Sequence, residues 1–110
     1  MRQQRIALVI QAVPSDAKSH TAFKLAQTIV TGDESVLNGI FFYGDGAYHA
    51  LLEYVEDNEI EDLNWSELNT PLCVCVASMK RRGIRETSFK VVGLGYLAEL
   101  YQENDKVMVF

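Results

Sequence analysis

Short apolar runs alternate with amphipathic stretches along the whole chain. The first run, residues 5–13 (RIALVIQAV), is continuous and rich in β-branched residues, which is typical of a strand buried on both faces. Further apolar runs predict strands at residues 36–43, 72–76, 89–92 and 106–110. Strands that alternate with helices favour a parallel sheet. We therefore expect a single-domain α/β fold spanning residues 1–110, with a mainly parallel sheet of about five strands and helices on both faces.

Helical spacing marks the segments between these strands. The first predicted helix has Ser19 as its N-cap and ends at Gly32. Its apolar face is formed by Ala22, Leu25, Ala26, Ile29 and Val30. Residues 47–55 are predicted to be helical, residues 63–68 to form a helical turn with Trp65 packed inward, and residues 78–82 to start a helix that stops at Gly83. A last helix is indicated by the spacing of Tyr96, Leu97, Leu100 and Tyr101.

Composition and charge narrow the class of protein. The chain has 110 residues, of which 48% are hydrophobic and 23% charged, an ordinary balance for a globular protein. No apolar run approaches the ~20 residues needed to span a bilayer, and the first run lacks the cleavage site of a signal peptide, so we expect a cytoplasmic protein without membrane contact. The net charge of −5 argues against direct nucleic-acid binding.

The charges are nevertheless unevenly distributed. Acidic residues gather in one segment, which comprises Glu53, Glu56, Asp57, Glu59, Glu61, Asp62 and Glu67. Basic residues gather in another, which comprises Lys80, Arg81, Arg82, Arg85 and Lys90. A solvated surface is the simplest interpretation of both, although the basic segment directly follows the two cysteines.

Ligands and reactive groups in open α/β sheets gather where the strands end. Three segments qualify: residues 14–19, 43–46 and 75–78. Gly44–Gly46 and Gly93–Gly95 lack the rest of a phosphate-binding motif, so we interpret both as turns. We expect His49 to be a surface or half-buried histidine rather than a general base. The first segment contributes Ser15, Asp16 and Ser19 as weaker candidates for the same rim.

Cys73 and Cys75 are the only cysteines. Two residues apart on a strand, they are separated by roughly 6.6 Å, near the upper limit for a disulfide. A zinc site would need two more ligands. Cys75 ends its strand just before a helix that begins around Ala77 or Ser78, whereas Cys73 lies deeper and is expected to pack. A free thiol is only about 3% thiolate at neutral pH, so position alone leaves Cys75 as either a catalytic nucleophile or an inert buried residue.

Several stretches together resemble the DsrE-like sulfur-relay family, and most closely its TusD-type sulfurtransferase subunits. The likeness runs nearly from end to end. It rests on residues 22–26 (AFKLA), 39–48 (GIFFYGDGAY), 75–83 (CVASMKRRG), 93–99 (GLGYLAE) and 105–110 (DKVMVF). The combination of FFY-x-x-G, CVA followed by RRG, and GLG is more specific than any one of these motifs.

The resemblance implies that Cys75 carries a persulfide, accepts sulfane sulfur from a donor protein and passes it to the next carrier. It implies no metal and no organic cofactor. The relay in this family feeds 2-thiolation of a tRNA wobble uridine, or sulfur oxidation in close relatives. The expected partners are donor and acceptor sulfur carriers, with TusB-like and TusC-like subunits in a heterohexamer or further copies in a homo-oligomer.

Two departures from the TusD-type pattern bear on the partner surface. The chain is shorter between Arg85 and Phe89, and residues 14–19 lack the expected glycine-containing pattern. Two other functions stay open at the level of sequence. One is a non-catalytic subunit that uses Trp65, Phe41, Phe42 and Phe110 as interface; the other is an anion-binding module built on the two glycine pairs.

Overall fold

Five parallel strands form one sheet in the order β4-β3-β2-β1-β5, which confirms the predicted α/β class. The structure is a computed structural model and describes residues 3–51 and 63–110. Each of the five predicted strands is present with slightly shifted ends. They are β1 (Gln4–Ile10), β2 (Ser35–Phe42), β3 (Leu72–Cys75), β4 (Lys90–Val92) and β5 (Lys106–Val109).

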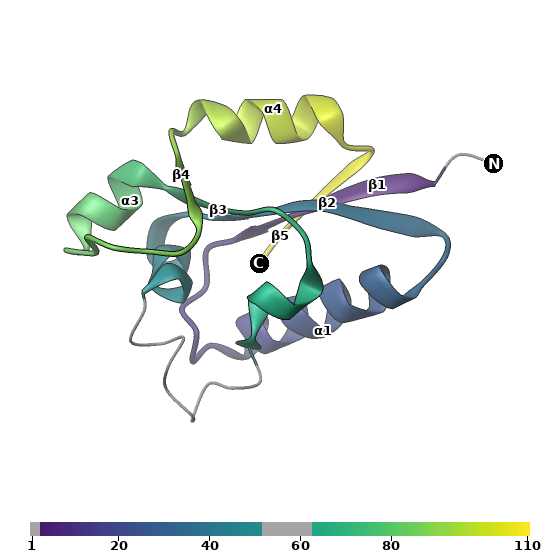
Figure 1. The fold of residues 1–110 in the computed structure, drawn as a ribbon, viewed down its shortest axis with the longest axis horizontal. Helices are drawn as coiled ribbons and strands as arrows, with labels where there is room; N and C mark the ends of the chain where they lie inside the picture. The colour runs from purple at the N-terminus through teal and green to yellow at the C-terminus, as the bar shows by residue number, and fades with distance from the viewer. Residues whose placement is uncertain (1–2, 52–62) are drawn as a thin grey trace.

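Helices lie on both faces of the sheet, as Figure 1 shows. They are α1 (Ala17–Thr31), α3 (Val76–Arg81) and α4 (Gly95–Glu103), with the 3₁₀ helices η1 (Gly44–Ala50) and η3 (Trp65–Leu68). The predicted N-cap of α1 was wrong: Asp16 caps the helix by accepting a hydrogen bond from Lys18 N at 2.9 Å, and Ser19 lies inside the first turn. None of the described helices is long and apolar enough to cross a membrane.

Two predicted segments extend into residues that the structure does not describe. The helix expected at residues 47–55 is a 3₁₀ helix that ends at Ala50, and the remainder lies largely in the undescribed range 52–62. Most of the acidic segment, from Glu53 to Asp62, also lies outside the described residues. At the end of α3 the prediction is confirmed. Gly83, at φ +69°, stops the helix and donates to Lys80 O at 3.3 Å, while Ile84 N donates to Met79 O at 3.0 Å.

The strands alternate their side chains between two hydrophobic clusters. One cluster lies under α1 and η3 and takes alternate residues of the strands, such as Leu8, Phe42 and Val74. The other lies under α4 and takes the residues between them, such as Val9, Phe41 and both cysteines. This alternation follows from the two-residue period of a strand. It places the sulfur of Cys75 on the α4 face of the sheet.

The aromatic residues considered as interface surface are instead part of these clusters. Phe41 and Phe42 are fully buried and Trp65 is 3% exposed, so the expectation that they supply exposed interface was wrong. The rings of Phe42 and Trp65 pack edge to face with centroids 5.3 Å apart. Inward packing of Trp65, predicted from its place in the helical turn, is confirmed.

Candidate active site at the end of strand β3

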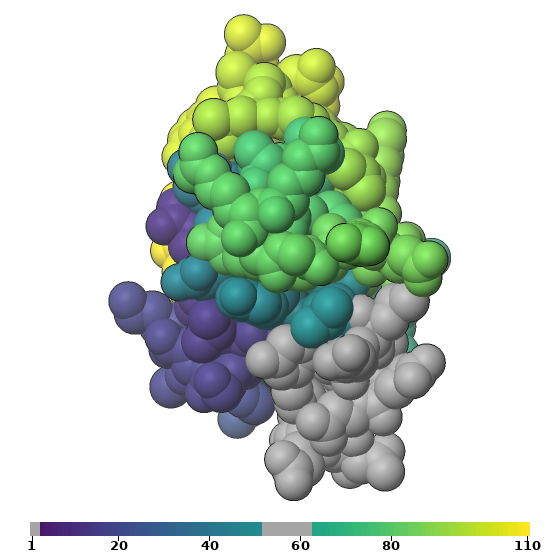
Figure 2. Space-filling model, turned by 90° about the vertical axis from the view of Figure 1, so that its left-hand side faces the viewer, coloured from purple at the N-terminus to yellow at the C-terminus, as the bar shows by residue number. Residues whose placement is uncertain are grey.

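Cys75 is the last residue of β3 and the N-cap of α3. Helix α3 therefore begins at Val76, slightly earlier than the sequence suggested. The register pairs Cys75 with Val92 on β4, and it pairs Phe42 on β2 with Val74, so Tyr43 follows alongside Cys75 at the same edge. Figure 2 looks at the end of the molecule where α3 (green) and η1 (teal) lie side by side.

Burial and hydrogen bonding act on the Cys75 thiol in opposite directions. Only 2% of the residue is exposed. Burial raises the pKa of Cys75, but the hydroxyl of Ser78, the N–H groups of Ser78 and Ala77 and the charge of Arg81 outweigh it, so the pKa lies below its ordinary value. A helix start with a nearby cation is the environment in which thiolates are stabilised. The surroundings therefore favour the nucleophilic form of this thiol.

Cys73 lies on the same face of the sheet in a different environment. It is 1% exposed, and both cysteines are free thiols. The hydroxyl of Tyr96 is hydrogen-bonded to Cys73, and burial together with this bond raises the pKa of Tyr96. The ring of Tyr96 also packs edge to face on Phe41 with centroids 5.6 Å apart. Cys73 is thus held in the cluster under α4, in agreement with its expected packing role.

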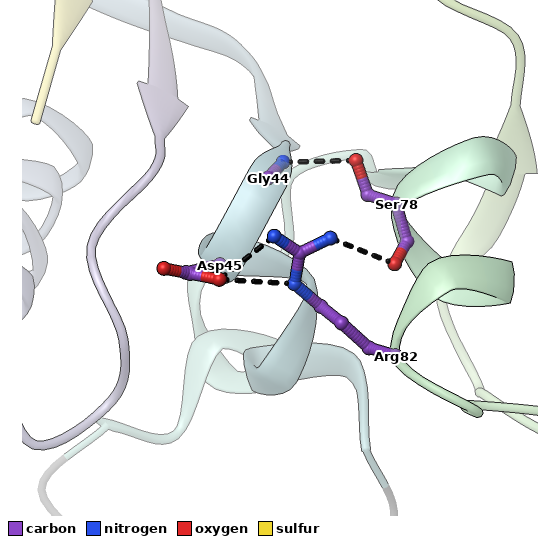
Figure 3. Close-up of polar contacts among 4 residues, drawn as sticks. All are labelled: Gly44, Asp45, Ser78 and Arg82. Carbon is purple, nitrogen blue, oxygen red and sulfur yellow. Dashed lines mark hydrogen bonds and ion pairs between the residues drawn. The ribbon is translucent and has the colours of Figure 1, made fainter.

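Polar contacts among Gly44, Asp45, Ser78 and Arg82 connect η1 to α3, the helix that Cys75 caps (Figure 3). The N–H of Gly44 donates to the Ser78 hydroxyl at 2.9 Å. Arg82 donates to Oδ1 of Asp45 from Nη2 at 2.7 Å and from Nε at 3.1 Å, and to the Ser78 carbonyl from Nη1 at 3.1 Å. Its guanidinium also lies 5.9 Å from the ring centre of Tyr48. These contacts fix the first turn of α3 against the end of β2.

The residues around Gly44–Gly46 are a 3₁₀ helix rather than a simple turn. Gly44 adopts φ +59°, and a Cβ on Gly46 would lie 1.8 Å from the carbonyl oxygen of Ile10. Glycine is therefore needed at the first position by backbone conformation and at the second by close approach. Since the Gly44 N–H is already bound by Ser78, it is engaged within the protein rather than presented to an anion.

Of the rim residues expected at the end of β1, Ser19 belongs to a separate buried network, whereas Ser15 is exposed and Asp16 caps α1. Ser19 is fully buried and donates to Val13 O at 2.7 Å. His49 is 4% exposed, so the expectation of a surface or half-buried side chain was wrong. Its Nε2 lies 3.0 Å from both Ser19 Oγ and Ala12 O, and Trp65 Nε1 lies 3.1 Å from its Nδ1. These residues join α1, η1 and η3 and are not brought together with Cys75.

Sequence reasoning singled out Cys75 as the candidate but did not identify the residues that surround it. Ser78 was assigned only to a helix start, and the pairing of Asp45 with Arg82 spans 37 residues. Ser78 could have been found from its spacing. It lies three residues after Cys75, the N-cap, and this spacing places the side chains of Cys75 and Ser78 at the same first helical turn. Within residues 3–51 and 63–110, no three His, Cys, Asp or Glu side chains are grouped as a metal ion would require.

Comparison with known proteins places the whole chain in a family. The model of the DsrE/DsrF-like family matches residues 4–110. The chain belongs to the DsrE/DsrF-like family. Among characterised proteins, it is similar to the sulfurtransferase TusD of Buchnera aphidicola subsp. Baizongia pistaciae (strain Bp), at 29% identity over 126 aligned positions that cover 94% of this chain and 96% of TusD.

A solved structure supports the fold of this DsrE/DsrF-like chain. The crystal structure of the YchN protein from E. coli matches with a TM-score of 0.70 and 19% identity, covering 99% of this chain and all of YchN. At that identity the likeness concerns the fold. Family membership and the likeness to TusD together support a role in sulfur relay.

Proposed function

We propose that this protein is a sulfurtransferase that carries sulfane sulfur as a persulfide on Cys75. The observation that carries the proposal is the position of Cys75. It caps α3 at the carboxyl edge of a parallel sheet, where Ser78, the first N–H groups of the helix and Arg81 favour its thiolate. The chain belongs to the DsrE/DsrF-like family and resembles TusD, which is named as a sulfurtransferase. Sulfur is therefore the expected cargo.

The transfer needs only thiol chemistry. The Cys75 thiolate attacks the outer sulfur of a persulfide on the donor, a new S–S bond forms, and the donor's own S–S bond breaks with its electron pair leaving as the donor thiolate. In the second half, a thiolate of the acceptor attacks the outer sulfur of the Cys75 persulfide, and Cys75 leaves as a thiolate. No net oxidation or reduction occurs in either half. The residues around Cys75 stabilise its thiolate when it attacks the donor persulfide and again when it is released in the second half.

The partners of this relay are proposed to be donor and acceptor sulfur-carrier proteins. Lys80 and Arg81 are exposed on α3, the helix that Cys75 caps, and Arg85 is exposed shortly after it, on a protein whose net charge is −5. This cationic surface suits an acidic face on an approaching carrier. Further proposed features are a cytoplasmic location, assembly with TusB-like and TusC-like subunits or as a homo-oligomer, and delivery of the sulfur to 2-thiolation of tRNA wobble uridine.

The direct test is transfer of labelled sulfur. The protein is incubated with a cysteine desulfurase, its carrier and cysteine labelled with ³⁵S, and the labelled residue is located by tandem mass spectrometry. We expect label on Cys75, loss of label in Cys75→Ser, and retention of label in Cys73→Ala. Label that persists in a folded Cys75→Ser variant would refute the proposal.

A second function, a non-catalytic subunit of an oligomer, is favoured by one observation: only 2% of Cys75 is exposed. A carrier must reach this sulfur, so the residues that cover Cys75 have to move when the partner docks. Reaction of Cys75 with a small alkylating reagent at neutral pH would favour the carrier. Normal assembly together with a thiol that reacts only after unfolding would favour the structural subunit.

A further inference from the structure

The hydroxyl proton of Ser78 has a restricted choice of acceptors. Ser78 is 5% exposed, and its oxygen already accepts the Gly44 N–H at 2.9 Å. Because a backbone N–H can only donate, that bond uses a lone pair of the hydroxyl and leaves its proton to be donated elsewhere. The proton therefore has to find an acceptor inside this part of the site.

Helical hydroxyls usually donate to the carbonyl one turn earlier. In α1 this is seen for Thr21, Thr28 and Thr31, whose hydroxyls lie 2.9–3.1 Å from the carbonyl oxygens four residues before them. No such bond is made by the Ser78 hydroxyl among the described residues. Cys75, the N-cap three residues earlier, offers its sulfur as an acceptor at the same first turn, and the Ser78 hydroxyl is among the groups that lower the pKa of Cys75.

The spacing of Cys75 and Ser78 explains this arrangement. Cys75 is the N-cap of α3 and Ser78 is the third residue of the helix, the two positions that exchange hydrogen bonds in a capping box. The neutral thiol of Cys75 closes no side-chain cap. The hydrogen-bond donors of the first turn of α3 are therefore available to the sulfur of Cys75 when it becomes a thiolate. Hydrogen bonds to an anion are shorter and stronger than those to the neutral thiol.

The backbone of Ser78 is held by the neighbouring ion pair. Nη1 of Arg82 binds the Ser78 carbonyl at 3.1 Å, while Nη2 and Nε of the same guanidinium bind Asp45 (Figure 3). Gly44 lies directly before Asp45 and binds the hydroxyl of Ser78. Arg82 and Asp45 thus act as positioning residues, because they fix both the turn of α3 that carries Ser78 and the start of η1, whose Gly44 N–H orients the Ser78 hydroxyl.

We propose that the Ser78 hydroxyl donates a hydrogen bond to the sulfur of Cys75. It stabilises the Cys75 thiolate when that thiolate attacks the donor persulfide, and again when it is released as the outer sulfur passes to the acceptor. The inference rests on the proposed function of Cys75 and adds to it a second residue that touches the reacting atom. In the leaving step, the acceptor thiolate bonds to the outer sulfur, the S–S bond breaks, and its electron pair returns to Cys75 beside the hydroxyl. The proton of Ser78 stays on its oxygen throughout.

The test compares Ser78→Ala, Ser78→Thr and wild type in the full chain. Alkylation of Cys75 by iodoacetamide is followed across pH, with the alkylated cysteine located by tandem mass spectrometry. For Ser78→Ala we expect the rate at neutral pH to fall about tenfold and the midpoint of the pH profile to move upward, because loss of a hydrogen bond to an anion disfavours the thiolate. Ser78→Thr keeps a hydroxyl and is expected to recover most of the rate. Thr21→Ala, which removes a helical hydroxyl from α1, is the matched control and is expected to behave as wild type.

Two results would overturn the inference. One is a folded Ser78→Ala variant whose pH profile superimposes on that of wild type. The other is obtained without any variant at this position: in wild type, the NMR shifts of Ser78 Cβ and the Gly44 amide should follow the ionisation of Cys75, and shifts that do not respond would refute the contact. The proposed function fails separately, if wild type shows the expected alkylation profile but takes up no labelled sulfur.

Discussion

The indole Nε1 of Trp65 lies 3.1 Å from Nδ1 of His49 and donates a hydrogen bond to it. Because an indole nitrogen is only a donor, Nδ1 must be unprotonated, and the proton of the neutral ring lies on Nε2. There it is directed to Ala12 O at 3.0 Å. Every position on the buried ring is therefore satisfied in one tautomer, and a second proton would have to face the N–H of Trp65.

This relationship predicts that acid destabilises the fold through His49. Burial is the main cause that lowers the pKa of His49 from 6.5 to about 4. Between these pH values the unfolded chain binds a proton that the folded chain does not, so stability is full above pH 6.5 and is lost as the pH falls towards 4. The full effect corresponds to about 3 kcal/mol in the free energy of unfolding. Urea denaturation measured across this range tests it.

Variants separate His49 from other acid-sensitive groups. His49→Gln cannot take up the proton and is expected to flatten the pH dependence in this range, although it lowers stability at neutral pH. His20→Gln is the matched control, because His20 is a half-buried histidine on α1 whose charge is the smallest of the causes that act on the pKa of His49, so most of the slope is expected to remain. An unchanged slope in a folded His49→Gln variant would contradict the assignment.

The sequence predicts the framework well because the framework follows from local pattern. Five apolar runs predicted the five strands, and the glycine that follows a basic turn predicted that α3 stops at Gly83. Where two local signals competed, the prediction was wrong. Serine and aspartate are both good N-cap residues. Asp16 caps α1, because the hydroxyl of Ser19 instead contacts His49 in the buried network.

The candidate site was predictable only in part, for a physical reason. The position of Cys75 could be predicted because it follows from the end of a strand and the start of a helix, which are both local features of the sequence. The burial of His49 and the pairing of Arg82 with Asp45 depend on contacts between segments 16 to 37 residues apart. Such contacts are created by packing of η1 against its neighbours, and hydrophobic periodicity carries no signal for them.

Replacement of Gly46 by alanine is expected to be strongly destabilising. A Cβ at this position would lie 1.8 Å from Ile10 O and 2.7 Å from Ile10 C, and a rigid backbone group cannot move aside as a flexible side chain would. Forcing η1 away from the end of β1 is expected to lower the free energy of unfolding by about 3 kcal/mol or more. Thermal or urea denaturation measures the loss. Gly93→Ala is the matched control, since nothing lies within 4 Å of a Cβ there, and equal losses in the two variants would contradict the packing argument.

Removal of the Cys73 sulfur is expected to affect stability and leave the chemistry in place. Cys73→Ala deletes a buried sulfur that is hydrogen-bonded to Tyr96, so we expect a loss of about 1 to 2 kcal/mol in the free energy of unfolding. Uptake of labelled sulfur by the folded variant should match wild type, because Cys75 keeps all of its donors. A loss of label in a variant that remains folded would instead make Cys73 part of the transfer.

The cationic surface beside the thiol predicts how transfer depends on salt. Lys80 and Arg85 are exposed and carry no ion pair within the described residues, so their charges are available to an acidic carrier. The double variant Lys80→Gln/Arg85→Gln is expected to slow sulfur transfer from such a carrier about tenfold at low ionic strength, chiefly through slower association. It should also be less sensitive to added salt than wild type. Arg81 is kept in this variant because its charge acts on Cys75 itself.

The matched control removes the same charge elsewhere. Lys18 and Lys24 are exposed on α1, so Lys18→Gln/Lys24→Gln lowers the net charge equally and leaves the surface around α3 intact. If steering is local, only the α3 variant slows transfer, and the two variants differ most at low salt. Equal slowing in both would mean that net charge alone governs the encounter, and an effect that persists at high salt would point to contacts other than long-range attraction.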